Sequence, residues 1–248
     1  MDLKTLWVGV LGVAVGAGGA VSTRSQWIDA CGVNCKTRPP SAKCPVHFEK
    51  GELVIADRAE AERIRASLMD GVFVPWLELG RAPTPDEVGR RLKLDETATS
   101  ALMDQFAACG DAADFGIHRV PESELIAVAW PLSNVPTGID VTVLGKKTVH
   151  ARCAIDSLGV SKMMGAKASV DATTHDGLPL HVEVDGDKLV SASLPAVVWK
   201  GGSCDEMMFF SSRAALDAWA AAHHTEGRAF ELDEAVKHGA EIFGRLAH

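Results

Sequence analysis

The spacing of apolar residues changes part-way along the chain, and this change limits the folds that it can adopt. From residue 59, apolar side chains recur every three or four positions, as at Ile64, Leu68, Val72 and, less regularly, Trp76. This spacing predicts an amphipathic helix. From about residue 139, short segments alternate apolar and polar side chains, which predicts β-strands. Helices in the first part and strands in the second favour an α+β fold.

Two further helices are marked by capping signals. Thr84 is expected as an N-cap, with Pro85 in the first turn and Glu87 as the return half of a capping box. Asp95 is expected to cap the next helix, which carries an apolar stripe and stops at Gly110. Strands are predicted at 117–120 and 124–130. Three helices followed by a hairpin predict a winged-helix-like domain over residues 59–135.

The charge of this module does not suit a nucleic-acid partner. The helix in the recognition position of such a module, residues 96–108, has no Lys or Arg and carries Glu96 and Asp104. A helix that reads DNA needs basic and amide groups for phosphates and base edges. The net charge of the chain is −8, which also disfavours long nucleic acids. We therefore expect a packing or lid domain and no nucleic-acid binding.

The second domain is predicted to span residues 136–248, after a loop with Pro136 and Gly138. It is expected to be a mixed or antiparallel β-sheet domain flanked by helices. Strands are predicted at 139–143, 147–150, 168–172, 180–184, 189–193, 197–200 and 207–210, and helices after Cys153, after Ser212 and from about Asp233 to Leu246. The chain has 248 residues, enough for one large or two small domains.

The first 58 residues fall into two segments. Residues 1–24 are apolar and uncharged from Thr5 to Thr23, which suits either a marginal membrane anchor or a signal peptide. A start codon assigned too early is a third possibility. Basic residues are commoner after this segment than before it, so an anchor would leave the rest of the chain in the cytoplasm, the location we expect.

Residues 25–58 are expected to be a linker that contains Cys and Pro. Cys31, Cys35 and Cys44 match no zinc-ligand spacing. They are interpreted as incidental thiols, with a disulfide after export or a thiol relay to a metal site as the alternatives. Cys109, beside Gly110, is expected to be structural.

Two cysteines and one carboxylate form the candidate site. Cys153 and Asp156 lie three residues apart at the start of a predicted helix, so they share one helix face. Cys204, which precedes an apolar strand, is the natural second thiol. Two thiolates select a soft metal ion. The helix start favours the thiolate form of Cys153, whereas Asp205 and Glu206 are expected to oppose ionisation of Cys204.

The Cys-Ala-x-Asp element within residues 147–164, together with Cys204 before Met207-Met208-Phe209-Phe210-Ser211, resembles the organomercurial lyase (alkylmercury lyase) family. Ala218-Trp219 and the segment 129–133 (Ala-Trp-Pro-Leu-Ser) support the likeness, which covers about residues 59–248.

The resemblance implies an enzyme that cleaves the carbon–mercury bond of alkyl or aryl mercury compounds, giving a hydrocarbon and Hg(II), in mercury detoxification. It assigns Cys153 and Cys204 as mercury ligands and Asp156 as the group that moves the proton to carbon and contributes to the mercury site. No cofactor is expected, with external thiols releasing the product. A mercuric reductase is implied as the recipient of Hg(II).

Two other functions stay open. One is a non-catalytic thiol-based protein that holds Hg or Cu on the same scaffold, and a weaker one is a metal-responsive regulator. Four methionines, Met163, Met164, Met207 and Met208, are soft enough to line a metal pocket, although their spacing is more typical of a core.

Overall fold

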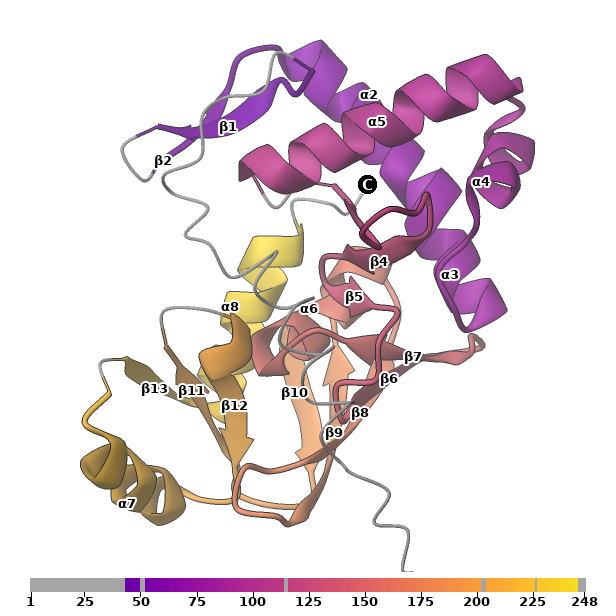
Figure 1. Cartoon of the computed structure of the whole chain (residues 1–248). Coiled ribbons are helices and arrows are strands. Elements are labelled where there is room, and N and C mark those ends of the chain that lie inside the picture. Colours follow the sequence, from indigo (N-terminus) through magenta and orange to yellow (C-terminus); the bar gives the residue numbers. More distant parts are fainter. Residues whose placement is uncertain (1–42, 50–51, 114–115, 202–203, 226, 245–248) are drawn as a thin grey trace, which may run out of the picture.

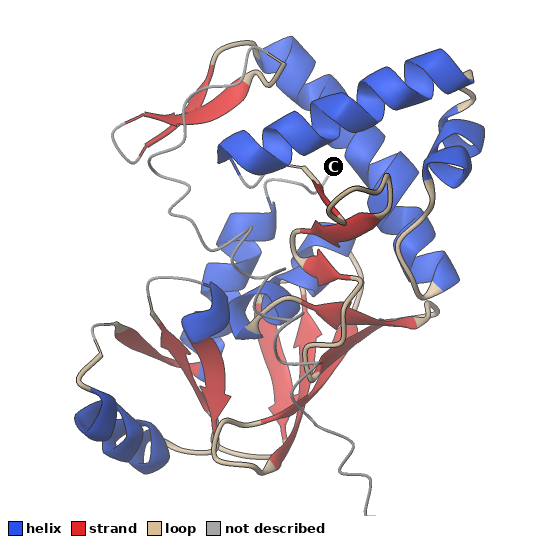
Figure 2. Cartoon of the chain, in the orientation of Figure 1, coloured by secondary structure: helices blue, strands red, loops and turns tan. Residues whose placement is uncertain are grey.

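The computed structural model describes residues 43–49, 52–113, 116–201, 204–225 and 227–244. Helices from the first half gather at one end of the molecule, and the sheets from the second half lie at the other end (Figures 1 and 2). The fold is α+β, as expected. Within the described residues, no helix combines the length and the apolar character needed to cross a bilayer. Residues 5–23, the predicted anchor, lie outside the described residues.

The N-terminal helices follow the predicted pattern. They are α2 (Arg58–Leu68), the π-helix η2 (Met69–Phe73), α3 (Val74–Leu79), α4 (Pro85–Leu92) and α5 (Glu96–Ala113). Thr84 and Glu87 form the predicted capping box, and the Asp95 carboxylate accepts a hydrogen bond from Ala98 N at 2.8 Å. The wider turn of η2 accounts for the irregular spacing before Trp76.

The predicted stop at Gly110 is wrong, because α5 continues through it to Ala113. A Cβ at Gly110 would lie 2.2 Å from the carbonyl oxygen of Ile117. The glycine therefore allows the returning chain to pass close to the helix, and it does not end the helix.

A disulfide corrects the interpretation of the cysteine-containing linker. Residues after Cys44 form an antiparallel hairpin, β1 (Val46–Glu49) and β2 (Glu52–Ile55), and Cys44 is bonded to Cys109 of α5. The relay role is therefore wrong for Cys44, whereas the structural role of Cys109 is confirmed. Cys31 and Cys35 lie outside the described residues. Because disulfides persist mainly in oxidising compartments, this bond favours the export alternative over the cytoplasm, and the location stays a prediction.

The larger sheet has eight strands in the order β10-β9-β8-β6-β7-β5-β4-β3, with every neighbouring pair antiparallel. Its strands are β3 (His118–Arg119), β4 (Ile126–Ala129), β5 (Leu132–Ser133), β6 (Ile139–Val143), β7 (Thr148–Ala151), β8 (Ala168–Thr173), β9 (Pro179–Asp185) and β10 (Lys188–Ala192). This sheet crosses the predicted boundary at residue 136. The winged-helix-like module and the division into domains therefore stay predictions.

A second, three-stranded sheet carries the other cysteine segment. Its order is β12-β11-β13, all antiparallel, with β11 (Val197–Lys200), β12 (Met207–Phe210) and β13 (Arg228–Glu231). Strands β11 and β12 were predicted, whereas β13 was not. Helix α7 (Arg213–His223) follows β12 and is capped by Ser212, as expected.

Helix α6 (Ala154–Met164) lies between the two sheets and packs closely on α8 (Leu232–Phe243) (Figure 1). Gly159 of α6 and Gly239 of α8 let the backbones approach, since a Cβ at Gly159 would lie 2.7 Å from Gly239 O. Nearly all residues of α6 are buried. The start of this helix is therefore held rigidly at the junction of the two sheets.

Candidate active site

Cys153 and Asp156 are placed by the start of α6. Cys153 is the N-cap residue, with extended backbone, and its sulfur accepts a hydrogen bond from Asp156 N at 3.5 Å. Asp156 lies in the first turn, three residues on, so both side chains lie on the same side of the helix. The prediction that these residues share a helix start is confirmed.

Cys204 reaches the same place from the other sheet. It begins the 3-10 helix η3 (Cys204–Glu206), which connects β11 to β12. The sulfur atoms of Cys153 and Cys204 and a carboxylate oxygen of Asp156 all lie within 4.8 Å of one another. Two metal–sulfur bonds of about 2.3 Å span at most about 4.6 Å, so one ion bridges such sulfurs with little movement.

The protonation state of Cys153 differs from the sequence-based expectation. Burial raises the pKa of this thiol well above 9.0, and the hydrogen bond with Cys204 and the charge of Asp156 raise it further. The hydrogen bond from Asp156 N lowers the pKa but is the smallest of these effects. Desolvation therefore outweighs the helix start, and Cys153 is a neutral thiol at pH 7.

An ion pair links the two cysteine segments and was not predicted. Arg152 Nη2 lies 3.5 Å from Asp205 Oδ1, and the Arg152 side chain is only 6% exposed. Its guanidinium also lies over the Trp130 ring, 5.7 Å from the centroid. Arg152 precedes Cys153 and Asp205 follows Cys204, so the pair joins the two segments that carry the thiols. Of the two acidic residues that were expected to oppose ionisation of Cys204, Asp205 is therefore paired with a cation.

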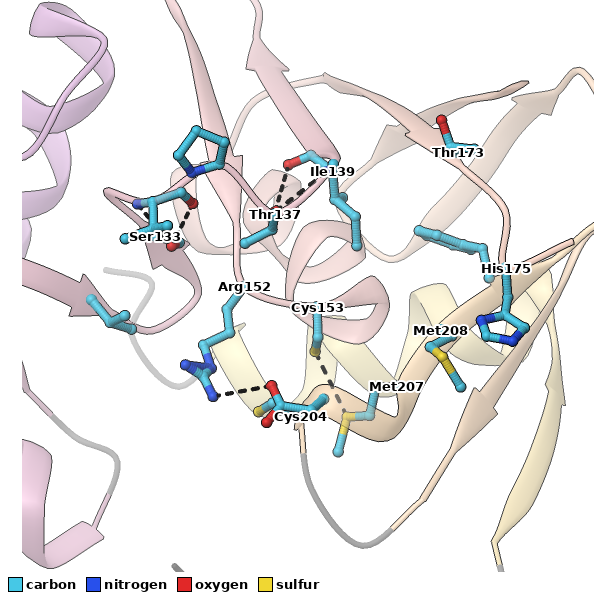
Figure 3. Close-up of a pocket in the computed structure, with 16 residues that line it drawn as sticks. Ser133, Thr137, Ile139, Arg152, Cys153, Thr173, His175, Cys204, Met207 and Met208 are labelled. Atoms are coloured by element: carbon cyan, nitrogen blue, oxygen red, sulfur yellow. Dashed lines mark hydrogen bonds and ion pairs between the residues drawn. The ribbon is translucent and has the colours of Figure 1, made fainter. Parts of the chain in front are cut away.

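The thiols open into a cavity of about 480 Å³. Figure 3 shows Cys153, Cys204 and Met207 on one side of this cavity, with Met208 and His175 on the other. Of the four methionines noted in the sequence, Met207 and Met208 line the cavity, whereas Met163 is buried in the core and Met164 packs against it. The wall comprises Val128, Ser133, Val135, Pro136, Thr137, Gly138, Ile139, Arg152, Cys153, Thr173, His175, Cys204, Asp205, Met207, Met208 and Phe209.

Comparison with known proteins agrees with the likeness noted in the sequence. Residues 132–244 match the family model described as MerB, alkylmercury lyase. Among solved structures, the chain is similar to one described as the mercury-bound form of MerB2, with 22% identity and a TM-score of 0.55. That match covers 77% of this chain and all of the other. Because the identity is low, the match is evidence for a shared fold and for nothing further. No curated protein matches. The segment that fits the family model contains α6, both thiols and α8, so this part of the chain is similar to the alkylmercury lyase family.

Proposed function

We propose that this protein is an organomercurial lyase that cleaves carbon–mercury bonds by protonolysis. One observation carries the proposal: two thiols and a carboxylate lie within 4.8 Å of one another, at the wall of a cavity of about 480 Å³. The thiols suit a soft metal, the carboxylate suits proton transfer, and the cavity offers room for an organic group.

Cys204 is the partly exposed thiol, whereas Cys153 is buried. We expect Cys204 to bind the R–Hg⁺ cation first, and mercury then replaces the proton of Cys153. Each thiolate donates electron density to mercury, which makes the bonded carbon more basic. The reaction converts R–Hg⁺ and two thiols into a mercury dithiolate, the hydrocarbon RH and one proton.

We expect Asp156 to carry the proton from Cys153 to carbon. The residue is only 4% exposed, and a carboxylate oxygen lies within 4.8 Å of both sulfurs. The raised pKa of Cys153 supports this order of events, because the thiol keeps its proton until mercury displaces it. External thiols then remove Hg(II), and a mercuric reductase is the expected recipient.

The test is the release of benzene from phenylmercury, measured by headspace gas chromatography with excess thiol. Cys153→Ala, Cys204→Ala and Asp156→Asn are each expected to lower the rate by about 10²–10⁴-fold relative to the parent. The paired substitution Cys44→Ala with Cys109→Ala serves as the control, since these cysteines form the disulfide outside the site. Activity unchanged in Cys153→Ala overturns the assignment.

The same assay separates the lyase from the non-catalytic alternative, a thiol-based Hg or Cu binding protein. That protein would retain one equivalent of Hg(II) through Cys153 and Cys204 and release no benzene. The carboxylate beside the thiols favours the lyase, because simple storage of a soft ion needs no proton carrier.

A further inference from the structure

A third sulfur atom lies beside the buried thiol of Cys153. Met207 Sδ lies 3.7 Å from Cys153 Sγ, and the thiol is oriented to donate its proton to the thioether. Met207 is partly buried and lines the cavity (Figure 3). Nothing in the proposed cleavage reaction uses this side chain.

Met207, the first residue of β12, follows Cys204, the first residue of η3, by three positions. Residues three apart along a 3-10 turn eclipse one another, and η3 separates Cys204 from Met207 by this spacing. Both side chains pack against the same main core cluster. The site therefore has two pairs of residues with a spacing of three: Cys153 with Asp156, and Cys204 with Met207.

The distance from Met207 to Cys153 suits a shared ion. If each sulfur lies about 2.3 Å from a soft metal, sulfurs 3.7 Å apart subtend an angle of roughly 110° at that metal. Such an angle fits three or four ligands around one ion.

We propose that Met207 is a third, thioether ligand of the Hg(II) held by Cys153 and Cys204. This inference rests on the proposed function only in that it places mercury between those thiols. A thioether is a soft donor that gives a lone pair without losing a proton. The complex of two thiolates, one thioether and Hg(II) is therefore neutral, which suits a buried site.

The neighbouring methionine provides a matched control. Met208 also lines the cavity, but it packs against the second core cluster with Trp199, Phe210 and Leu216. Adjacent residues of a strand point to opposite faces, so Met208 does not share the position of Met207. Met→Leu is nearly volume-conserving and costs less than about 1.5 kcal/mol of stability.

The first measurement uses the full chain loaded with one equivalent of Hg(II), without any organomercurial. Excess free cysteine is added, and loss of the mercury–thiolate ultraviolet absorption gives the rate of Hg(II) removal. Met207→Leu is expected to lose Hg(II) about tenfold faster than the parent, while Met208→Leu matches the parent. Circular dichroism and thermal unfolding establish that both variants are folded.

The second measurement detects the bond itself. In selenomethionine-labelled protein, X-ray absorption at the mercury edge is expected to show one selenium neighbour in the parent and in Met208→Leu, and none in Met207→Leu. Absence of selenium from the parent spectrum, or equal rates of Hg(II) removal in the parent and Met207→Leu, overturns the inference alone. Equal acceleration by both variants also overturns it, since that result indicates general repacking. A parent that retains no Hg(II) overturns the proposed function as well.

Discussion

Gly159→Ala tests how closely the packing of α6 on α8 controls the site. The added Cβ would lie 2.4 Å from Phe243 Cδ2, 2.7 Å from Gly239 O and 3.0 Å from Gly239 C. A phenyl ring is able to turn aside, but the Gly239 backbone moves only if the whole of α8 moves. The substitution therefore forces the two helices apart or shifts α6, which begins at the N-cap Cys153.

The net effect follows from two opposing contributions. Alanine stabilises a helix interior by about 0.8–1.0 kcal/mol relative to glycine. Overpacking costs typically about 1–3 kcal/mol, and the rigid backbone contact favours the upper part of that range. We expect a net loss of roughly 1–2 kcal/mol in the free energy of unfolding. For a chain of this size, that loss lowers the melting temperature by roughly 2–8 °C.

Urea unfolding and the phenylmercury assay measure the two consequences on the same preparation. The control is Gly244→Ala, whose Cβ would lie 3.2 Å from Lys162 Cγ, the stem of a flexible side chain. Its unfolding free energy is expected to stay within about 0.5 kcal/mol of the parent. Should Gly159→Ala prove as stable as the parent with full activity, the close backbone approach does not constrain the site.

Three other expectations concern the cysteines. The Cys44–Cys109 disulfide closes a loop with a sequence separation of 65 residues. It is expected to contribute roughly 2–5 kcal/mol to the free energy of unfolding. The Cys44→Ala, Cys109→Ala variant measures this contribution as lost stability. A thiol reagent should modify the partly exposed Cys204 before Cys153, which is 2% exposed, and mass spectrometry of the labelled peptides reports the order. Because the pKa of Cys153 is raised on folding, its stabilising effect is complete below the unfolded value near 9.0 and is lost as pH rises toward the folded value. The unfolding free energy of the parent should therefore fall above pH 9 more steeply than that of Cys153→Ala, by at most about 1.4 kcal/mol per pH unit.

Local signals predicted the elements, and contacts between distant residues supplied most of what was missed. The capping box at Thr84 and Glu87 depends on residues within one turn, so the sequence alone identifies it. Gly110 carries the same local signal as a helix stop, and only the approach of Ile117 reveals its actual role. The pairing of Cys44 with Cys109 spans 65 residues, for which sequence spacing offers no guide.

The candidate site shows the same limit. A family motif identified Cys153, Asp156 and Cys204, but their neighbours required coordinates. Asp205 forms an ion pair with Arg152, which follows strand β7 of the larger sheet, and the thioether sulfur of Met207 lies 3.7 Å from Cys153 Sγ. The neutral state of Cys153 was missed because the helix start is visible in the sequence, whereas the degree of burial is not.

If the proposed function holds, burial of Cys153 favours ions that bind sulfur strongly. A bare thiolate is disfavoured there by desolvation, so a hard cation that only attracts negative charge gains little from the thiol. A soft cation such as R–Hg⁺ replaces the proton one for one and leaves the buried charge unchanged. The desolvation cost that disfavours the free Cys153 thiolate therefore does not oppose formation of a mercury–sulfur bond. The Arg152–Asp205 pair adds no net charge to this balance. In the proposed reaction, mercury displaces the Cys153 proton beside Asp156, so metal capture would supply the acid that cleavage of the carbon–mercury bond requires.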